Sequence, residues 1–218
     1  MTVAIARSAL AAADAPRVPQ VEQALAALHA ASNGQALVTI HPATGVARFV
    51  RIPPGAVQAA TIEATLAEQA NHFLAEFGGA FGLQDPDQEL RLLAVKTDPL
   101  GATRFIYEQV YQGVPVFAGE LRIHFDGTGQ LVAANGVIIP DLALNLAPKL
   151  APDEAAAIAH GSVATRQPDA RAAATGQLQM QVTGLVVFRT NLAQGLPGQN
   201  HLVYEVRVLA DRAVHESV

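Results

Sequence analysis

Histidine has the widest chemical use of any side chain in this protein, because imidazole binds metals and transfers protons near neutral pH. The seven histidines are scattered, at positions 29, 41, 72, 124, 160, 201 and 215. No two of them are four residues apart, as in the H-E-x-x-H motif that places two imidazoles on one face of a helix. His124 and Asp126 would share the polar face of a strand and could bind a metal weakly, but solvation of that face explains them better. The spacing therefore predicts no metal site.

The sequence also lacks the other common catalytic patterns. Gly127-x-Gly129 is too short for a dinucleotide fingerprint and falls in an expected hairpin turn. Ser162 lacks the flanking glycines of a nucleophile elbow, and neither a P-loop nor a cysteine is present. Glu68 and Glu76 are expected on the outer face of a helix, where they make the surface soluble and do not form an acid–base pair. We therefore expect no catalytic residue, no cofactor and no metal, and a protein that acts by binding another protein.

The composition of the chain argues against nucleic acid and anionic membranes as partners. The 218 residues are 50% hydrophobic and 15% charged, with a formal net charge of -5. A chain with no basic block and no interleaved aromatic and basic residues is not typical of a protein that binds nucleic acid or an anionic membrane. No apolar run approaches the roughly 18 residues that a membrane span needs. The length suits one large domain or two small ones.

The segment Tyr107–Pro140 has the alternation of a β-meander. Leu121, Ile123 and Phe125 would face one way and the polar residues between them the other, which is typical of a strand with one buried face. Asp126–Gly129 has the composition of a hairpin turn, and the next strand returns from Leu131.

Aromatic and apolar residues near a break in this meander form a candidate partner interface. The run before the break places Phe105, Tyr107, Gln109 and Tyr111 on one strand face, and Ile106, Glu108 and Val110 on the other. Pro115 has no backbone donor, so it belongs at a sheet edge or a turn. The candidate interface residues are Tyr111, Gly113, Val114, Pro115 and Phe117. Packing of the aromatic residues on a neighbouring helix is the other interpretation, and the two are compatible.

The remaining elements follow an α+β plan. We expect a helix up to Asn33-Gly34, a hairpin of Ala36–Ile40 with Val46–Ile52, a helix over Ile62–Phe81 capped by Thr61, strands Leu90–Val95 and Thr103–Tyr111, a helix over Pro152–Thr165, and strands Leu178–Phe188 and His201–Leu209. The residues before Val18 are expected to form an arm, and Gln167–Gly176 a loop. A helix followed by antiparallel strands packs as a sheet wrapped over that helix.

One stretch resembles a known family. It reads Y-x-Q-V-Y-x-G-V-P-V-F-x-G-E-L, then a D-G-x-G turn, then a strand with N-G and a closing P-D-L. This pattern resembles the FTP domain, the fungalysin/thermolysin propeptide module of secreted zinc metallopeptidases, over about Phe73–Leu142. Lys149–Ala155 is similar to the start of a PepSY domain, although Ala151 stands where that family has a Ser or Thr cap, and alanine caps a helix poorly.

The resemblance implies a domain plan. Residues 1–34 would be an arm and helix, 35–145 an FTP-like domain, and 146–218 a PepSY-like domain, each with an antiparallel sheet wrapped on a helix in a cystatin-like way. PepSY domains of this family close with a further strand and a linker that crosses the active-site cleft. The chain stops at His215–Val218, so we expect the closing strand to be absent and the second domain to be truncated.

The resemblance also implies a function. The chain would be the prosegment of a secreted, thermolysin-like zinc metallopeptidase, acting as folding assistant and inhibitor of the catalytic domain that is its partner in cis. The first residues, with Arg7 inside an apolar stretch, are not typical of a signal peptide. The alternative is a free-standing secreted module that binds or inhibits a protease without an attached peptidase. A structural domain of a larger cell-surface protein is a third possibility.

Overall fold

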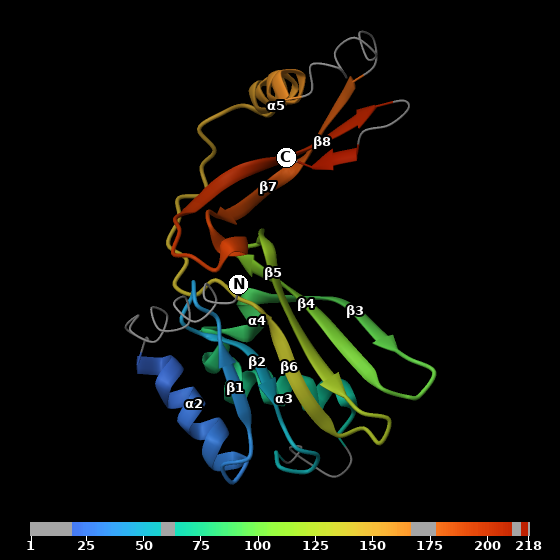
Figure 1. The fold of residues 1–218 in the computed structure, drawn as a ribbon. Helices are drawn as coiled ribbons and strands as arrows, with labels where there is room; N and C mark the ends of the chain where they lie inside the picture. The colour runs from blue at the N-terminus through green and yellow to red at the C-terminus, as the bar shows by residue number, and fades with distance from the viewer. Residues whose placement is uncertain (1–18, 58–63, 167–177, 211–214, 218) are drawn as a thin grey trace, which may run out of the picture. The chain divides into compact units, whose positions relative to one another are not determined.

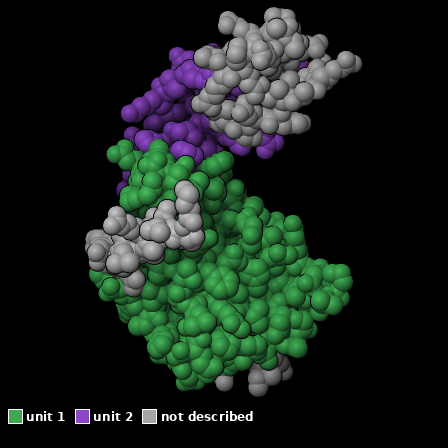
Figure 2. Space-filling view, viewed as in Figure 1, with its two compact units in different colours: residues 1–142, 189–199 green, residues 143–188, 200–218 purple. Residues whose placement is uncertain are grey.

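The computed structural model describes residues 19–57, 64–166, 178–210 and 215–217, and it divides the chain into two compact units (Figures 1 and 2). Unit 1 consists of Met1–Leu142 and Arg189–Gln199. Unit 2 consists of Ala143–Phe188 and Asn200–Val218. Both units combine helices with antiparallel strands, which confirms the expected α+β class.

Two helices supply the helical side of the unit 1 core. Helix α2 spans Pro19–Ala31 and buries Val21, Ala24 and Leu28, which recur every three or four residues and so lie on one face. Helix α3 spans Leu66–Phe77 and continues as the 3₁₀ turn η1, Gly78–Phe81. Its buried face is formed by Ala70, Phe73, Leu74 and Phe77.

Helix α3 begins later than the sequence indicated. Its N-cap is Thr65, whose Oγ1 accepts a hydrogen bond from Glu68 N at 3.3 Å, while Thr65 N donates to Glu68 Oε2 at 2.7 Å. This reciprocal capping box satisfies two backbone N–H groups at once. The expectation that Thr61 caps this helix is therefore wrong, and Thr61 itself lies outside the described residues. Both threonines can cap, but only Thr65 has a glutamate three residues later.

Six strands form the described sheet of unit 1. They are β1 (Leu37–Ile40), β2 (Ala47–Arg51), β3 (Leu90–Thr97), β4 (Thr103–Tyr111), β5 (Val114–Phe125) and β6 (Leu131–Val137), with the short helix α4 (Pro86–Glu89) before β3. Hydrogen-bonded neighbours are antiparallel throughout, in the order β1-β2-β6-β5-β4-β3. The strands β3 to β6 follow one another as a meander (Figure 1).

One face of this sheet packs on α3. The register aligns Val50, Ala134, Ile123 and Phe105 across four strands, and all four side chains are buried. Phe105 meets Phe125 edge-on, with ring centroids 5.7 Å apart, a favoured aromatic geometry. Because side chains alternate along a strand, the residues between them face the other side of the sheet.

Unit 2 is built from helix α5 (Pro152–Arg166) and strands β7 (Leu178–Arg189), β8 (Asn200–Ala210) and β9 (His215–Ser217). α5 buries Ala155, Ala159 and Val163, one residue per turn, and these small side chains let the helix lie close to β8. Strand β9 pairs antiparallel with β8 from Arg207 to Leu209. This short strand extends the second sheet by three residues, and the expected truncation of the second domain stays a prediction.

The segment between β7 and β8 belongs to unit 1. It contains the 3₁₀ turn η2 (Leu192–Gln194), and Arg189 Nη2 donates to the carbonyl of Ala43 at 3.4 Å. The arm before Val18 and the loop Gln167–Gly176, both expected from the sequence, lie outside the described residues. The division into 1–34, 35–145 and 146–218 stays a prediction.

Candidate functional site

The candidate interface residues lie at one end of the β4–β5 hairpin. Tyr111 pairs with Val114, and Val110 with Pro115, so the turn consists of Gln112 and Gly113 alone. Both turn residues have positive φ, 49° and 84°, the combination that a type I′ turn requires and that matches the twist of the flanking strands. Pro115 is therefore a ladder residue beside the turn and not one of the two turn residues.

A large bulge follows the turn. Glu108 pairs with Glu120 and Val110 with Pro115, which leaves one residue on β4, Gln109, opposite the four residues of β5 from 116 to 119. Ala118 takes a left-handed conformation, φ 60°, and the bulge buries Val116 while leaving Phe117 48% exposed. Val110 is buried as well, so the strict alternation that we expected through Val110 is wrong. Bulges reorient side chains in this way.

The side chain of Gln109 forms two hydrogen bonds with the backbone of Ile139, which follows β6. Its Nε2 donates to the carbonyl of Ile139 at 2.8 Å, and its Oε1 accepts from Ile139 N at 2.9 Å. Gln109 is 1% exposed, so these bonds satisfy polar groups that water cannot reach. A Cβ on Gly119 would lie 2.9 Å from Gln109 Cβ, so glycine at 119 leaves room for this side chain.

Two further residues of the pattern also serve the fold. A Cβ on Gly136 would collide with the carbonyl oxygen of Glu120 on the next strand, so only glycine permits the close approach of β6 to β5 there. Tyr107 is buried, and burial raises the pKa of its phenol to about 12. The meander therefore depends on four residues of the pattern, Tyr107, Gln109, Gly119 and Gly136. The structural role of Gln109 was not predicted from the sequence. This role could have been inferred because Gln109 is a single amide among the aromatic residues expected on the same strand face.

The candidate interface residues themselves are partly accessible. Gly113 and Phe117 are exposed, and Tyr111, Val114 and Pro115 are half-buried. The Tyr111 hydroxyl accepts a hydrogen bond from Gln112 Nε2 at 3.2 Å. The structure thus brings all five residues to one end of a hairpin, and their contact with a partner stays a prediction.

Titratable side chains do not converge on a reactive centre within the described ranges. His124 Nε2 lies 2.6 Å from Asn135 Oδ1, and hydrogen bonds from Thr128 and from the backbone of its own turn lower the pKa of Asp126. These two candidates for a weak metal site are therefore engaged separately. No group of three potential metal-ligating side chains occurs in the part of the chain that the structure describes.

His41 is the most enclosed of the described histidines. It lies in the β1–β2 turn, 6% exposed, and its Nδ1 accepts a hydrogen bond from Ala43 N at 3.2 Å. Burial lowers its pKa, and the charges of Arg48 and Arg189 lower it further. The neutral form of His41 thus stabilises a turn, and this position has no proton-transfer partner suited to catalysis among these neighbours.

Comparison with known families identifies the meander. Residues 88–137 match the model described as the Fungalysin/Thermolysin Propeptide Motif. The match begins in α4 and ends at the last residue of β6, so it covers β3 to β6. This confirms the FTP part of the resemblance over a shorter stretch than Phe73–Leu142. The motif belongs to the propeptide of such peptidases, which is their non-catalytic part.

No protein of the curated collection matches the chain. None of the helices in the described ranges is both long enough and apolar enough to cross a bilayer.

Proposed function

We propose that the chain is the prosegment of a secreted zinc metallopeptidase, which assists folding of the catalytic domain and keeps that domain inactive. The observation that carries the proposal is the match of residues 88–137 to the propeptide motif. The matched residues form a continuous antiparallel meander, and Gln109, Gly119 and Gly136 each have a structural role in it. Zinc and the catalytic base would belong to the partner domain.

The physical basis of both activities is linkage. A module that binds the native catalytic domain, and not its unfolded chain, shifts the folding equilibrium toward the native form. The same contact hinders access of substrate. In the parent polypeptide the partner is attached in cis, which raises its effective concentration far above that of a separate protein.

We assign unit 2 to the PepSY-like part of this prosegment. Helix α5 followed by strands β7 and β8 supports this assignment, since a helix preceding paired strands is the order that the resemblance implies. Lys149–Ala155 leads into α5, and Glu154 Oε2 accepts a hydrogen bond from Ala151 N at 2.8 Å. That bond compensates in part for the absence of a Ser or Thr side chain at position 151.

The surface that we propose for the catalytic domain is the hairpin end formed by Tyr111, Gly113, Val114, Pro115 and Phe117. Phe117 is 48% exposed on the bulge, and aromatic side chains are enriched in the cores of protein interfaces. The tight turn and the bulge hold these side chains on a rigid support, which lowers the entropy cost of binding.

Refolding tests the proposal directly. Catalytic domains of thermolysin-like and fungalysin-like peptidases are refolded from denaturant with and without the chain, and their yield and casein hydrolysis are measured. We expect a higher refolding yield and inhibition in trans. If the wild-type chain does neither at tens of micromolar, the prosegment proposal fails, and a free-standing secreted module becomes the better account.

Paired variants test the hairpin end. Val114→Asp and Phe117→Ala should weaken both the folding assistance and the inhibition. Leu100→Asp and Leu100→Ala are the matched controls, because Leu100 is 87% exposed in the β3–β4 turn. Circular dichroism first establishes that all four variants fold. A folded Val114→Asp variant that assists and inhibits as well as Leu100→Asp would show that the hairpin end is not the contact surface.

A further inference from the structure

A row of basic side chains crosses the sheet of unit 1 on the face opposite α3. The register pairs Lys96 with Arg104 and Arg104 with His124, and His124 is joined through Ala133 to Arg51. The four basic residues come from β3, β4, β5 and β2, and Ala133 of β6 lies between the last two. We call Lys96, Arg104, His124 and Arg51 the basic row.

The basic row faces away from the core. The residues next to it along the strands, Val50, Phe105, Ile123 and Ala134, are buried, so alternation turns the basic row to the other face. Lys96, Arg104 and Arg51 are exposed, and His124 is half-buried. Neighbouring strands lie about 5 Å apart, so the backbone positions of Lys96, Arg104 and His124 follow one another at that spacing.

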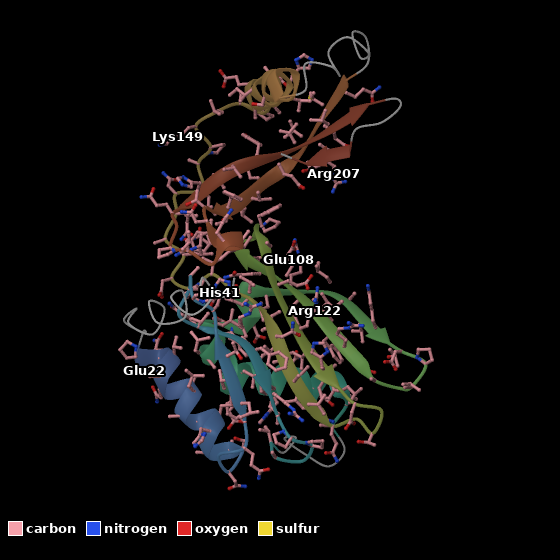
Figure 3. The ribbon with its side chains drawn as sticks, in the orientation of Figure 1. Glu22, His41, Glu108, Arg122, Lys149 and Arg207 are labelled. Carbon is pink, nitrogen blue, oxygen red and sulfur yellow. The ribbon has the colours of Figure 1, made fainter. Side chains whose placement is uncertain are left out.

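Folding alone does not account for this arrangement. Like charges directly opposite each other on adjacent strands destabilise a sheet. Two other arginines of the same sheet are neutralised, since Arg91 forms an ion pair with Glu108, and Arg122 with Glu120. Figure 3 labels Glu108 and Arg122. Within the described ranges, no carboxylate forms an ion pair with Lys96, Arg104 or Arg51.

Apolar side chains adjoin the basic row. The next row along the strands aligns Phe49, Asn135, Arg122 and Ile106. Phe49 is 41% exposed, and Ile106 is half-buried. An exposed aromatic side chain beside unneutralised cations is suited to a surface that carries both carboxylates and apolar groups.

We infer that the basic row docks a carboxylate-bearing surface of a protein partner, which, if the proposed function holds, is the catalytic domain of the peptidase. A protein fits better than a nucleic acid, because the ion-paired Glu108 and Glu120 lie on the same face and the chain has a net charge of -5. Both features repel a continuous phosphate backbone. The partner carboxylates would replace the missing counter-charges of Lys96, Arg104 and Arg51.

Charge reversal tests this surface with a simple probe. The probe is a fluorescein-labelled peptide of glutamate residues, and binding to the full chain is followed by anisotropy at low salt. The double variant Lys96→Glu/Arg104→Glu should lose at least about tenfold in affinity, as expected for close charge pairs. The control, Lys149→Glu/Arg207→Glu, changes the net charge equally at exposed sites of unit 2 and should bind like the wild type. The melting temperature of Lys96→Glu/Arg104→Glu should not fall.

The outcomes decide each part separately. An equal loss of affinity in both double variants would show that net charge alone governs binding. Tighter binding of a single-stranded oligonucleotide than of the peptide would show that the surface binds any polyanion. Either result overturns the inference. A second arm measures binding of the catalytic domain as a function of salt. If the wild type binds that domain and Lys96→Glu/Arg104→Glu binds it equally well, the inferred docking surface is wrong. If the wild type binds the peptide but no catalytic domain, the basic row stands and the proposed function fails.

Discussion

At the scale of single residues, the side chain of Gln109 forms hydrogen bonds that the backbone of a strand normally forms. Its amide presents one donor and one acceptor to Ile139, as a neighbouring strand would. Four residues of β5 bulge away from β4 at this point, so the backbone itself cannot supply these bonds. A buried hydrogen bond contributes little net free energy, but a buried group left without its partner is costly.

Replacing Gln109 with leucine should therefore destabilise unit 1. The change keeps the volume but leaves the N–H and C=O of Ile139 without a partner, and each such group costs about 1–3 kcal/mol. We expect the free energy of unfolding to fall by roughly 2–4 kcal/mol in urea titrations. Gln88→Leu, on the exposed side of α4, is the matched control and should change it little. Equal stability of the two variants would contradict the bridging role of Gln109.

His41 links the stability of the same unit to pH. Its folded-state pKa lies below the usual 6.5 because of burial and because of the charges of Arg48 and Arg189, and its bond from Ala43 N requires an unprotonated Nδ1. The unfolded chain therefore binds more protons below pH 6.5, and the stabilisation present above that pH is lost as the pH falls through it. The slope from this group is at most about 1.4 kcal/mol per pH unit.

The measurement is urea unfolding between pH 5 and 8. We expect the free energy of unfolding to fall on acidification below pH 6.5, and His41→Asn to reduce the slope, since the asparagine oxygen can accept the same hydrogen bond without titrating. His124, whose pKa is also lowered by burial, will retain its share of the slope. His160→Asn on the exposed side of α5 is the control. An unchanged slope in His41→Asn would rule out this turn as the source.

At the scale of elements, the start of α3 shows how a cap selects one boundary among several. Thr61 and Thr65 both precede an apolar run, but only Thr65 has Glu68 at the position that completes a capping box. Hydrogen bonds from the backbone N and the hydroxyl of Thr65 lower the pKa of Glu68. The cap fixes where the helix begins and therefore which residues, Ala70, Phe73, Leu74 and Phe77, meet the sheet.

Removing the cap should weaken α3 by a predictable amount. Thr65→Ala deletes the acceptor of the Glu68 N–H, and such changes typically cost about 1 kcal/mol. Thr65→Ser keeps the hydroxyl and should stay within a few tenths of a kcal/mol of the wild type, roughly the difference between good caps. The comparison is made by thermal denaturation, where about 1 kcal/mol corresponds to about 2–4 °C for a chain of this size. Identical melting of the two variants would exclude the capping role.

At the scale of the whole molecule, the chain forms two units of different character. Unit 1 has the large aromatic core of Phe73, Phe77, Phe81 and Phe125. The described part of α5 in unit 2 buries only small side chains, Ala155, Ala159 and Val163. The first residues of unit 2, 143–149, form no helix or strand and are mostly exposed.

Limited proteolysis should report this organisation. Exposed backbone without regular structure is cleaved first, so we expect early cuts within 143–149 and late cuts within Phe105–Asp126. The composition of Gln167–Gly176, which lies outside the described residues, predicts a second early cut. Fragments are identified by mass spectrometry over a time course, with the fully unfolded chain in urea as the control for intrinsic site preference. Early cleavage within Leu121–Phe125, whose apolar side chains are buried, would contradict the view that the meander is the stable centre.

The sequence by itself determined the α+β class, the strands on both sides of the turn at residues 112 and 113, the helix α5 and the FTP resemblance. These features depend on local periodicity and on turn residues, which are written within a few positions of each other. The sequence also suggested the five residues of the candidate interface, whose contact with a partner stays a prediction. Alternation alone placed Leu121, Ile123 and Phe125 in the core.

Only the tertiary structure decided the features that depend on pairing between distant segments. The bulge opposite Gln109 adds residues to one strand and breaks the alternation, so burial of Val110 could not be read from its neighbours. The alignment of Lys96, Arg104, His124 and Arg51 depends on the registers of four strand pairs, and a slip of one residue would send each side chain to the other face. Register is fixed by packing of the whole sheet on α3, which no local stretch of sequence specifies.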